Sequence, residues 1–210
     1  MSKRKFSEDG KRVVVEDFDS YVKSQEEIHN IKDDLRHVRR NKEVIDEALK
    51  INKNIKSILD IGCREALTQD ICDEIGVDFL GVDVSEKSVN YAKSKGRNVM
   101  VGDAHSLSDA VKEKYDFILS VHSLEHCYDP VRVINECKKC LNKNGLVGIR
   151  VPVQKDISNQ PAHFSIYSPA SLKALLSSCG FGISYTKSIR PGEKYEEAII
   201  IGQLDSGEVN

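Results

Sequence analysis

The sequence predicts an α/β fold: a doubly wound, seven-stranded sheet whose last two strands form an antiparallel hairpin, preceded by an N-terminal helical extension. After Ile55, short runs rich in Val, Ile and Leu alternate with segments of helical periodicity, which is typical of a parallel sheet covered on both faces. The last two runs are separated by a turn containing Pro191 and Gly192 and by no helix, which predicts the hairpin. Between residues 18 and 50 there is no Gly or Pro and apolar residues recur at helical intervals, which predicts the extension.

Each expected strand is a short apolar run, and each expected helix is an amphipathic segment between two such runs. The strands are expected at residues 57–61, 79–84, 98–101, 115–121, 145–151, 182–189 and 197–203. The helices are expected at residues 68–75, 88–94, 109–114, 131–141 and 168–179. The chain then divides into a flexible tail (1–17), a helical extension or lid (18–54), the main domain (55–204) and a C-terminal tail (205–210).

Composition and charge exclude several classes of protein. A hydrophobic share of 40% and a charged share of 30% exclude a disordered chain. With 31 Lys and Arg against 33 Asp and Glu, the formal charge is −2, so no overall basic field favours nucleic acid as a partner. No apolar stretch approaches the ~20 residues of a membrane helix, and the first ten residues lack the apolar segment of a secretory signal. We therefore expect a cytoplasmic protein with no membrane partner.

The six cysteines are too sparse for a disulfide scaffold, and we expect buried free thiols. The alternative is a zinc site built on Cys137-Lys-Lys-Cys140, with His122, His126 and Cys127 upstream as further ligands. However, this Cys pair lies in a segment of helical periodicity without Gly or Pro, whereas a structural zinc site holds such a pair on a tight turn. We therefore expect no metal.

Three acids follow the first three expected strands. Asp60 ends the first strand just before Gly62, Asp83 ends the second 23 residues later, and Asp103 follows the third. In open α/β sheets, ligands bind at the carboxyl ends of the strands, and an acid ~20 residues after the glycine loop binds ribose hydroxyls. Any one of these acids is explained equally well as a turn or helix cap. Their repetition at successive strand ends favours a nucleotide-like ligand.

These segments, in this order, resemble motifs of the class I S-adenosylmethionine-dependent methyltransferases. The resemblance covers residues 57–203 and is greatest to the small-molecule branch that includes the ubiquinone-biosynthesis type (types 11 and 23). Its matching segments are Leu59-Asp-Ile-Gly-Cys63, Leu80-Gly-Val-Asp-Val-Ser85, Gly102-Asp-Ala104, Tyr115-Asp-Phe-Ile-Leu-Ser120, Ser123-Leu-Glu-His126, Cys140-Leu-Asn-Lys-Asn-Gly-Leu146 and His163-Phe-Ser-Ile-Tyr-Ser-Pro-Ala-Ser-Leu172. The resemblance implies a Rossmann-like methyltransferase fold with S-adenosylmethionine as cofactor.

The resemblance also implies a set of cofactor-binding residues. Asp83 would accept both ribose hydroxyls, Asp103 would accept the adenine amino group, and Asp60 or the carbonyl groups around Ser120 would bind the methionine ammonium. The full set is Asp60, Gly62, Cys63, Arg64, Asp83, Val84, Asp103, Ala104, Ser120 and His122.

One departure concerns the family's first motif, Asp-x-Gly-x-Gly-x-Gly. This chain has Arg64 and Ala66 at the second and third glycine positions. Arg64 would crowd the methionine tail, pair with its carboxylate, or lie at the surface of an adjusted loop.

The catalytic candidates are three histidines, His122, His126 and His163, which would lie beside the transferred methyl group as general bases. The alternative for each is a structural histidine. In the extension, Tyr21 is a candidate lid residue, and a further set of residues is expected to bind an anionic substrate group: Arg36, Arg39 and Arg40. The alternative for these arginines is a solvated helix face, because acidic residues surround them.

We therefore expect an enzyme that transfers a methyl group from S-adenosylmethionine to oxygen or nitrogen of a small-molecule acceptor, such as a sugar or another metabolite. Three alternatives remain open: a methyltransferase acting on RNA or protein, a non-catalytic relative that binds the cofactor, and an aminopropyltransferase on the same scaffold.

Overall fold

The computed structural model describes residues 5–6, 13–14, 35–154, 162–192 and 196–204. Tyr21 and the first part of the expected extension, residues 18–34, lie outside the described residues. Two short strands, β1 (Lys5–Phe6) and β2 (Val13–Val14), pair antiparallel.

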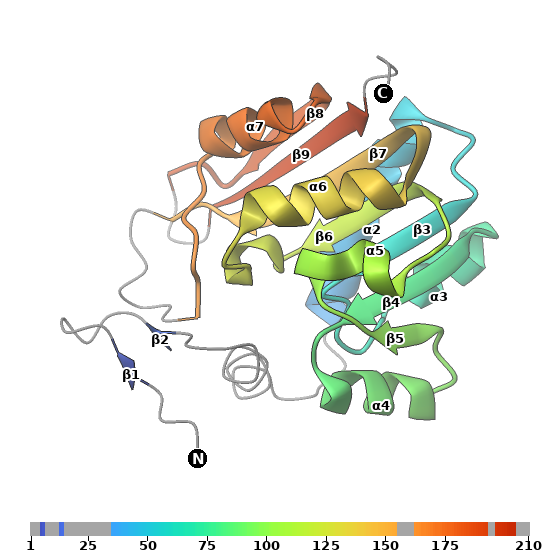
Figure 1. The fold of residues 1–210 in the computed structure, drawn as a ribbon. Coiled ribbons are helices and arrows are strands. Elements are labelled where there is room, and N and C mark those ends of the chain that lie inside the picture. Colours follow the sequence, from blue (N-terminus) through green and yellow to red (C-terminus); the bar gives the residue numbers. More distant parts are fainter. Residues whose placement is uncertain (1–4, 7–12, 15–34, 155–161, 193–195, 205–210) are drawn as a thin grey trace.

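A seven-stranded sheet forms the centre of the molecule (Figure 1), in the order β5-β4-β3-β6-β7-β9-β8. Its strands are β3 (Ser57–Ile61), β4 (Asp78–Asp83), β5 (Val99–Val101), β6 (Tyr115–Val121), β7 (Leu141–Pro152), β8 (Phe181–Ile189) and β9 (Glu197–Leu204). The strands from β5 to β7 run parallel, whereas β9 runs antiparallel to both β7 and β8. The predicted doubly wound fold class and the closing hairpin are confirmed.

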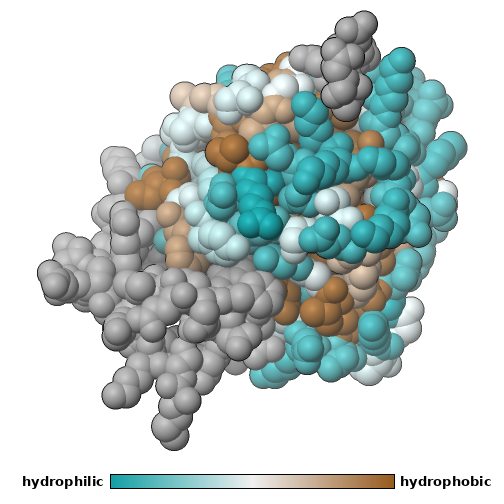
Figure 2. Space-filling view, in the orientation of Figure 1, coloured by the Kyte–Doolittle hydropathy of each residue, from teal (hydrophilic) through white to brown (hydrophobic). Residues whose placement is uncertain are grey.

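Helices cover both faces of the sheet, and each face has its own apolar core. They are α2 (Leu35–Ile51), α3 (Thr68–Ile75), α4 (Glu86–Ser94), α5 (Leu107–Ala110), α6 (Pro130–Cys140) and α7 (Pro169–Ser178), with the 3-10 turns η1 (Ala104–Ser106) and η2 (Leu124–His126). One core contains residues of α2, α3 and α4, and the other contains residues of α5, α6 and α7. No helix in the described part of the chain is both long and apolar enough to cross a membrane. On the face shown in Figure 2, hydrophilic side chains predominate and the hydrophobic ones form separate small patches.

Two predicted element boundaries differ from the structure. The helix expected at 109–114 is instead α5, which ends at Ala110, because Val111 turns to an extended conformation and is buried. Glu136 on α6 holds the start of α5, since its Oε2 atom accepts hydrogen bonds from the amide and hydroxyl of Ser108. The strand expected to begin at Gly145 begins at Leu141, directly after α6, and its pairing with β6 is irregular before Leu146.

Helix α2 packs along one face of the sheet against β6 and β7. Val44, Ile45 and Ala48 form its buried stripe and are 0% exposed. Gly148 of β7 permits this close packing, because a Cβ there would lie 2.8 Å from Val44 and 2.6 Å from Phe117. The described part of the extension is therefore mainly a packing helix, and its first two turns reach the carboxyl-terminal edge of the sheet.

Candidate active site

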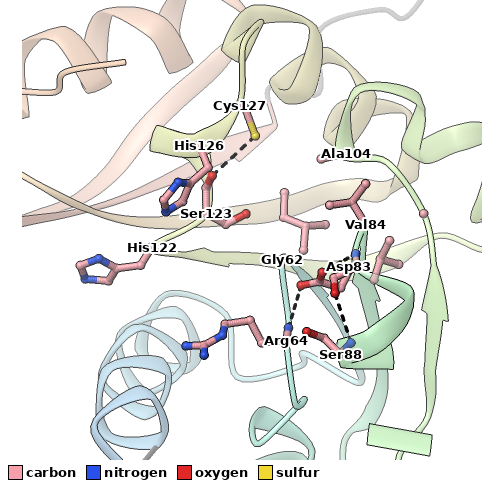
Figure 3. A pocket seen from close by; sticks show the side chains of 14 residues that line it. Gly62, Arg64, Asp83, Val84, Ser88, Ala104, His122, Ser123, His126 and Cys127 are labelled. Atoms are coloured by element: carbon pink, nitrogen blue, oxygen red, sulfur yellow. Dashed lines mark hydrogen bonds between the residues drawn. The ribbon is translucent and has the colours of Figure 1, made fainter. Parts of the chain in front are cut away.

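An open cleft lies at the carboxyl ends of β3, β4 and β6, where the strand order reverses between β3 and β6 (Figure 3). The space between its walls, which is open to solvent, is about 630 Å³. The lining residues are Ile61, Gly62, Arg64, Val82, Asp83, Val84, Ser85, Ser88, Gly102, Ala104, His122, Ser123, His126 and Cys127. Six of the ten predicted cofactor-binding residues thus line the cleft, whereas Asp60, Cys63, Asp103 and Ser120 do not.

The loop after β3 keeps a glycine-like backbone although it contains only one glycine. Gly62, Arg64 and Ala66 have φ angles of 72°, 51° and 54°, all in the left-handed region that favours glycine. A Cβ on Gly62 would also lie 2.2 Å from the Oγ atom of Ser123, so this position requires glycine for two reasons. Two positions of this loop that favour glycine by their backbone conformation are thus occupied by Arg64 and Ala66.

Asp83 lies at the end of β4 and is 8% exposed. Its Oδ1 atom accepts a hydrogen bond from the amide of Ser85, and its Oδ2 atom accepts one from the amide of Arg64, both at 2.9 Å. Burial raises the pKa of Asp83, and these two amides oppose that shift. The carboxylate is held in one orientation beside the apolar surface of Val84 and Ala104, an arrangement that suits the ribose and base of a nucleoside.

Asp60 is buried behind the cleft rather than on its wall. Its Oδ2 atom accepts a hydrogen bond from the Thr68 hydroxyl at 2.6 Å, and that hydroxyl accepts one from the Asn41 amide at 2.6 Å. Burial raises the pKa of Asp60 to about 7, although the Thr68 hydroxyl opposes this shift. In this structure Asp60 connects β3 to α3 and, through Asn41, to α2.

Asp103 also lies just outside the cleft, where it caps η1. Its Oδ1 atom accepts hydrogen bonds from the amide of His105 at 3.0 Å and from the Nδ1 atom of its ring at 2.7 Å. Burial would raise the pKa of Asp103, but these hydrogen bonds outweigh it and lower the pKa. The His105 ring stacks on Tyr128 with the ring centroids 3.7 Å apart. Ala104, the next residue after Asp103, does line the cleft.

Cys63 and Ser120 lie in the core beneath the cleft. Cys63 is 9% exposed, and its sulfur lies so close to Gly81 that a Cβ there would come within 2.7 Å of it. Ser120 is 1% exposed, and its hydroxyl has no hydrogen-bond partner among the described residues. Neither side chain faces the cleft.

His122 lines the cleft with both ring nitrogens engaged. Its Nε2 atom lies 2.8 Å from Glu197 Oε1, and its Nδ1 atom lies 3.3 Å from Glu125 Oε1. Burial would lower the pKa of His122, but the two glutamates outweigh it and raise the pKa. Both ring nitrogens of His122 face carboxylates, and a ring that donates from both has no lone pair left for a general base.

The predicted arginines of α2 have different environments. Arg40 pairs with the buried Glu197 at 2.7 Å, whereas Arg36 and Arg39 are exposed. Glu197 also accepts hydrogen bonds from Arg150, whose Nη1 atom donates to Glu43 at 2.7 Å. Burial would raise the pKa of Glu197, but His122 and Arg150 outweigh it and lower the pKa to about 2.

Sequence reasoning missed this buried group of charges. The available signal was a charged residue within an apolar run in each of two strands: Arg150 in the second half of β7 and Glu197 at the start of β9. The missed serines of the cleft also had a signal. Ser85 lies two residues after the strand-end acid Asp83 and caps α4, because its Oγ atom accepts a hydrogen bond from the amide of Ser88.

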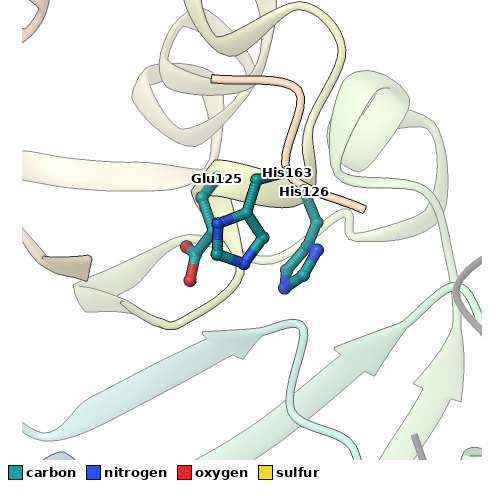
Figure 4. Close-up of side chains that lie close together, drawn as sticks. All are labelled: Glu125, His126 and His163. Carbon is teal, nitrogen blue, oxygen red and sulfur yellow. The ribbon is translucent and has the colours of Figure 1, made fainter. Parts of the chain in front are cut away.

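Glu125, His126 and His163 lie close together (Figure 4), and His126 also lines the cleft. The Nδ1 atom of His126 donates to the carbonyl of Ala162 at 3.1 Å, and that of His163 donates to Gln154 Oε1 at 2.6 Å. In the neutral form of either ring, Nε2 is then the acceptor nitrogen. Burial lowers the pKa of His163 to about 4, so this ring is neutral at physiological pH.

The same three side chains form a donor set that suits a divalent metal. Their ligand atoms lie within 4.8 Å of one another, and two imidazoles with one carboxylate are ligands that Zn²⁺ and Fe²⁺ accept. The alternative Cys137–Cys140 pair lies on α6 with both thiols buried in the core. Within the described ranges, Glu125, His126 and His163 are the group that brings three such ligands together.

Comparison with known proteins gives this cleft a family. Residues 29–185 match the family model described as a methyltransferase domain. The ubiquinone biosynthesis O-methyltransferase of Pelagibacter ubique is 35% identical over 103 residues, which are 46% of this chain and 42% of that protein. The chain thus matches less than half the length of this curated relative.

Two solved structures share the fold. A magnesium protoporphyrin IX methyltransferase from Synechocystis PCC 6803, with S-adenosylhomocysteine bound, has a TM-score of 0.62 at 16% identity, over 87% of this chain and 94% of that one. An S-adenosylmethionine-dependent methyltransferase from Archaeoglobus fulgidus has a TM-score of 0.60 at 19% identity, over 81% of this chain and 100% of that one. The chain, three quarters of which matches the family model, belongs to the methyltransferase domain family, whose cofactor is S-adenosylmethionine.

Proposed function

We propose that this protein transfers a methyl group from S-adenosylmethionine to oxygen or nitrogen of a small-molecule acceptor. The observation that carries the proposal is the Asp83 carboxylate, fixed by two backbone amides inside the cleft beside a loop of glycine-like backbone. An ionised carboxylate in this position accepts two ribose hydroxyls, and the adjoining Ala104 and Val84 provide apolar contact for the base.

The residues of the cleft would do little covalent chemistry. S-Adenosylmethionine, when bound, supplies a methyl group already activated on a sulfonium sulfur. The chain must therefore align an acceptor, exclude water, and remove a proton where the acceptor is a hydroxyl or a protonated amine. His163 is the proposed base, because its ring is neutral and Gln154 fixes its tautomer, although a pKa of about 4 makes it a weak base. His126 meets it edge-on with the centroids 4.8 Å apart and would help to orient it.

Isothermal titration with S-adenosylmethionine and S-adenosylhomocysteine tests the cofactor half of the proposal. Wild type should bind both, and Asp83→Ala should weaken binding by about 1–3 kcal/mol, because two ligand hydroxyls lose a charged acceptor. Asp73→Ala is the control, since Asp73 is exposed on α3 away from the cleft. If wild type binds neither ligand, the proposal is wrong.

Release of S-adenosylhomocysteine in the presence of hydroxyl- and amine-bearing metabolites tests the acceptor half. A small-molecule acceptor should give turnover that His163→Gln reduces by about 10²- to 10⁴-fold if the ring is a general base. Cofactor affinity should be unchanged in that variant, because His163 does not line the cofactor cleft. Turnover only with RNA or protein substrates would replace the small-molecule proposal.

A further inference from the structure

We propose that Arg64 binds the carboxylate of the cofactor's amino-acid tail and makes the cleft selective for adenosine ligands that carry this tail. The inference rests on the proposed function and deepens it. It assigns a binding role to the residue that occupies a position where the family has glycine.

The backbone of Arg64 is fixed beside the ribose-binding acid. Its φ angle of 51° places it in the left-handed region, which costs a side-chain-bearing residue roughly 1–2 kcal/mol. Its amide donates to Asp83 Oδ2 at 2.9 Å. Because the amide of Arg64 binds the acid that would hold the ribose, its side chain begins directly beside the ribose site.

The guanidinium of Arg64 lies at the end of the cleft opposite Ala104 (Figure 3). Its Nη1 atom donates to His37 Nε2 on α2 at 3.0 Å, and its Nη2 atom lies 3.6 Å from Glu65 Oε1. The side chain is 19% exposed, so it is neither a surface arginine nor a core one. Contacts from the loop and from α2 thus hold the guanidinium in place before a ligand binds, which lowers the entropic cost of binding.

The positions of the lining residues along the cleft indicate which part of the ligand the Arg64 guanidinium would bind. With the base beside Ala104 and the ribose at Asp83, the third part of the ligand, its amino-acid tail, extends toward Arg64 and His122. That tail ends in a carboxylate, and a guanidinium with five N–H donors matches a carboxylate in charge and in planar geometry. Glu65, whose Oε1 atom lies 3.6 Å from the guanidinium, partly offsets its positive charge.

Titration with two ligands that differ only in the tail isolates this contact. S-Adenosylhomocysteine carries the amino acid, and 5′-methylthioadenosine lacks it. Arg64→Gln should weaken S-adenosylhomocysteine binding about 10- to 100-fold, because a charged hydrogen-bond donor is lost, and should change 5′-methylthioadenosine binding by less than about threefold. Arg64→Gly guards against misfolding, because glycine adopts the required φ angle without strain, and it should show the same selective loss.

Arg97→Ala is the matched control. Arg97 donates to the carbonyl of Ala66 in the same loop and pairs with Asp70, but it does not line the cleft. If an arginine here acts only by holding the loop, Arg97→Ala and both Arg64 variants should weaken the two ligands equally. Equal losses for the two ligands, or no loss, in the Arg64 variants would overturn the proposal. Failure of wild type to bind either ligand would instead contradict the proposed function.

Discussion

At the scale of single residues, Gly62 has the least freedom to change. Its φ angle of 72° acts together with the lack of space around it, because a Cβ added there would lie 2.2 Å from Ser123 Oγ. Gly62→Ala should therefore destabilise the fold by about 2–4 kcal/mol, the sum of left-handed strain and overpacking. Urea unfolding measures this loss. The double variant Gly62→Ala with Ser123→Gly should regain the stability lost to overpacking but not the stability lost to backbone strain. If the losses in unfolding free energy of the two single variants simply add in the double variant, the clash is absent.

The low pKa of His163 predicts how this residue titrates. NMR should show its ring taking up a proton only near pH 4, well below the ordinary value of 6.5, because burial disfavours the charged form. The unfolded chain binds that proton at higher pH, so His163 makes the fold lose stability as pH falls from about 6.5 toward 4. A ring that titrates near 6.5 in the folded protein would contradict the buried, neutral assignment.

His122 should show the opposite dependence. Its pKa is raised in the folded protein, because Glu125 and Glu197 outweigh burial. Its contribution to stability is therefore fully present below about pH 6.5 and is lost as pH rises through the raised pKa. Glu197→Gln should lower the pKa of His122, and an NMR titration of the His122 ring in that variant measures the change.

Sequence reasoning located the cleft more securely than it assigned the residues within it. The three strand-end acids indicated the correct edge of the sheet, yet only Asp83 lines the cleft. Asp60 points instead to Thr68, and Asp103 to the ring of His105. The order of residues along the chain places an acid at a strand end, but the direction of its carboxylate depends on partners that are fixed only when helices pack.

At the scale of elements, α2 is predicted to be essential to the sheet. Ile45 is 0% exposed in the core between α2 and the strands, so Ile45→Ala should destabilise the protein by about 2–5 kcal/mol. Lys50→Ala, an exposed change on the same helix, should cost less than about 0.5 kcal/mol. Thermal or urea unfolding compares the two. Similar small effects would mean that the helix is only loosely attached.

The order of strands and helices was predictable because the spacing of apolar residues and the positions of turn residues can be read from short stretches of sequence. Strand Ser57–Ile61 and helix Thr68–Ile75 lie where their patterns predicted them. The start of α5 was not predictable, because Ser108 there is bound by Glu136, which lies 28 residues away. The setting of His122 required Glu197, 75 residues away on β9. Contacts of this separation leave no periodic pattern in the sequence.

At the scale of the whole molecule, the ion pairs of Glu197 connect β9 to α2, to β7 and to the residue that follows β6. Glu197 is 2% exposed and meets Arg40, His122 and Arg150. Glu197→Ala should destabilise the protein by about 3–5 kcal/mol, because Arg150 would be left buried without this partner. Glu47→Ala, which removes a surface pair with Lys50, is the control and should cost less than about 1 kcal/mol. Equal effects would show that the buried charges are not coupled.

The position of β9 has a consequence for how the protein is made. This strand is the last one among the described residues, yet it lies between β7 and β8, and it carries Glu197 to His122, which lines the cleft. A ribosome that has released only the residues before β9 therefore presents β8 with no neighbour in the sheet and Arg150 without its main counter-ion. Domains generally fold as units during synthesis. Here the eight-residue β9 completes both the sheet and the set of ion pairs around Glu197, so neither is complete until residue 204 has left the exit tunnel.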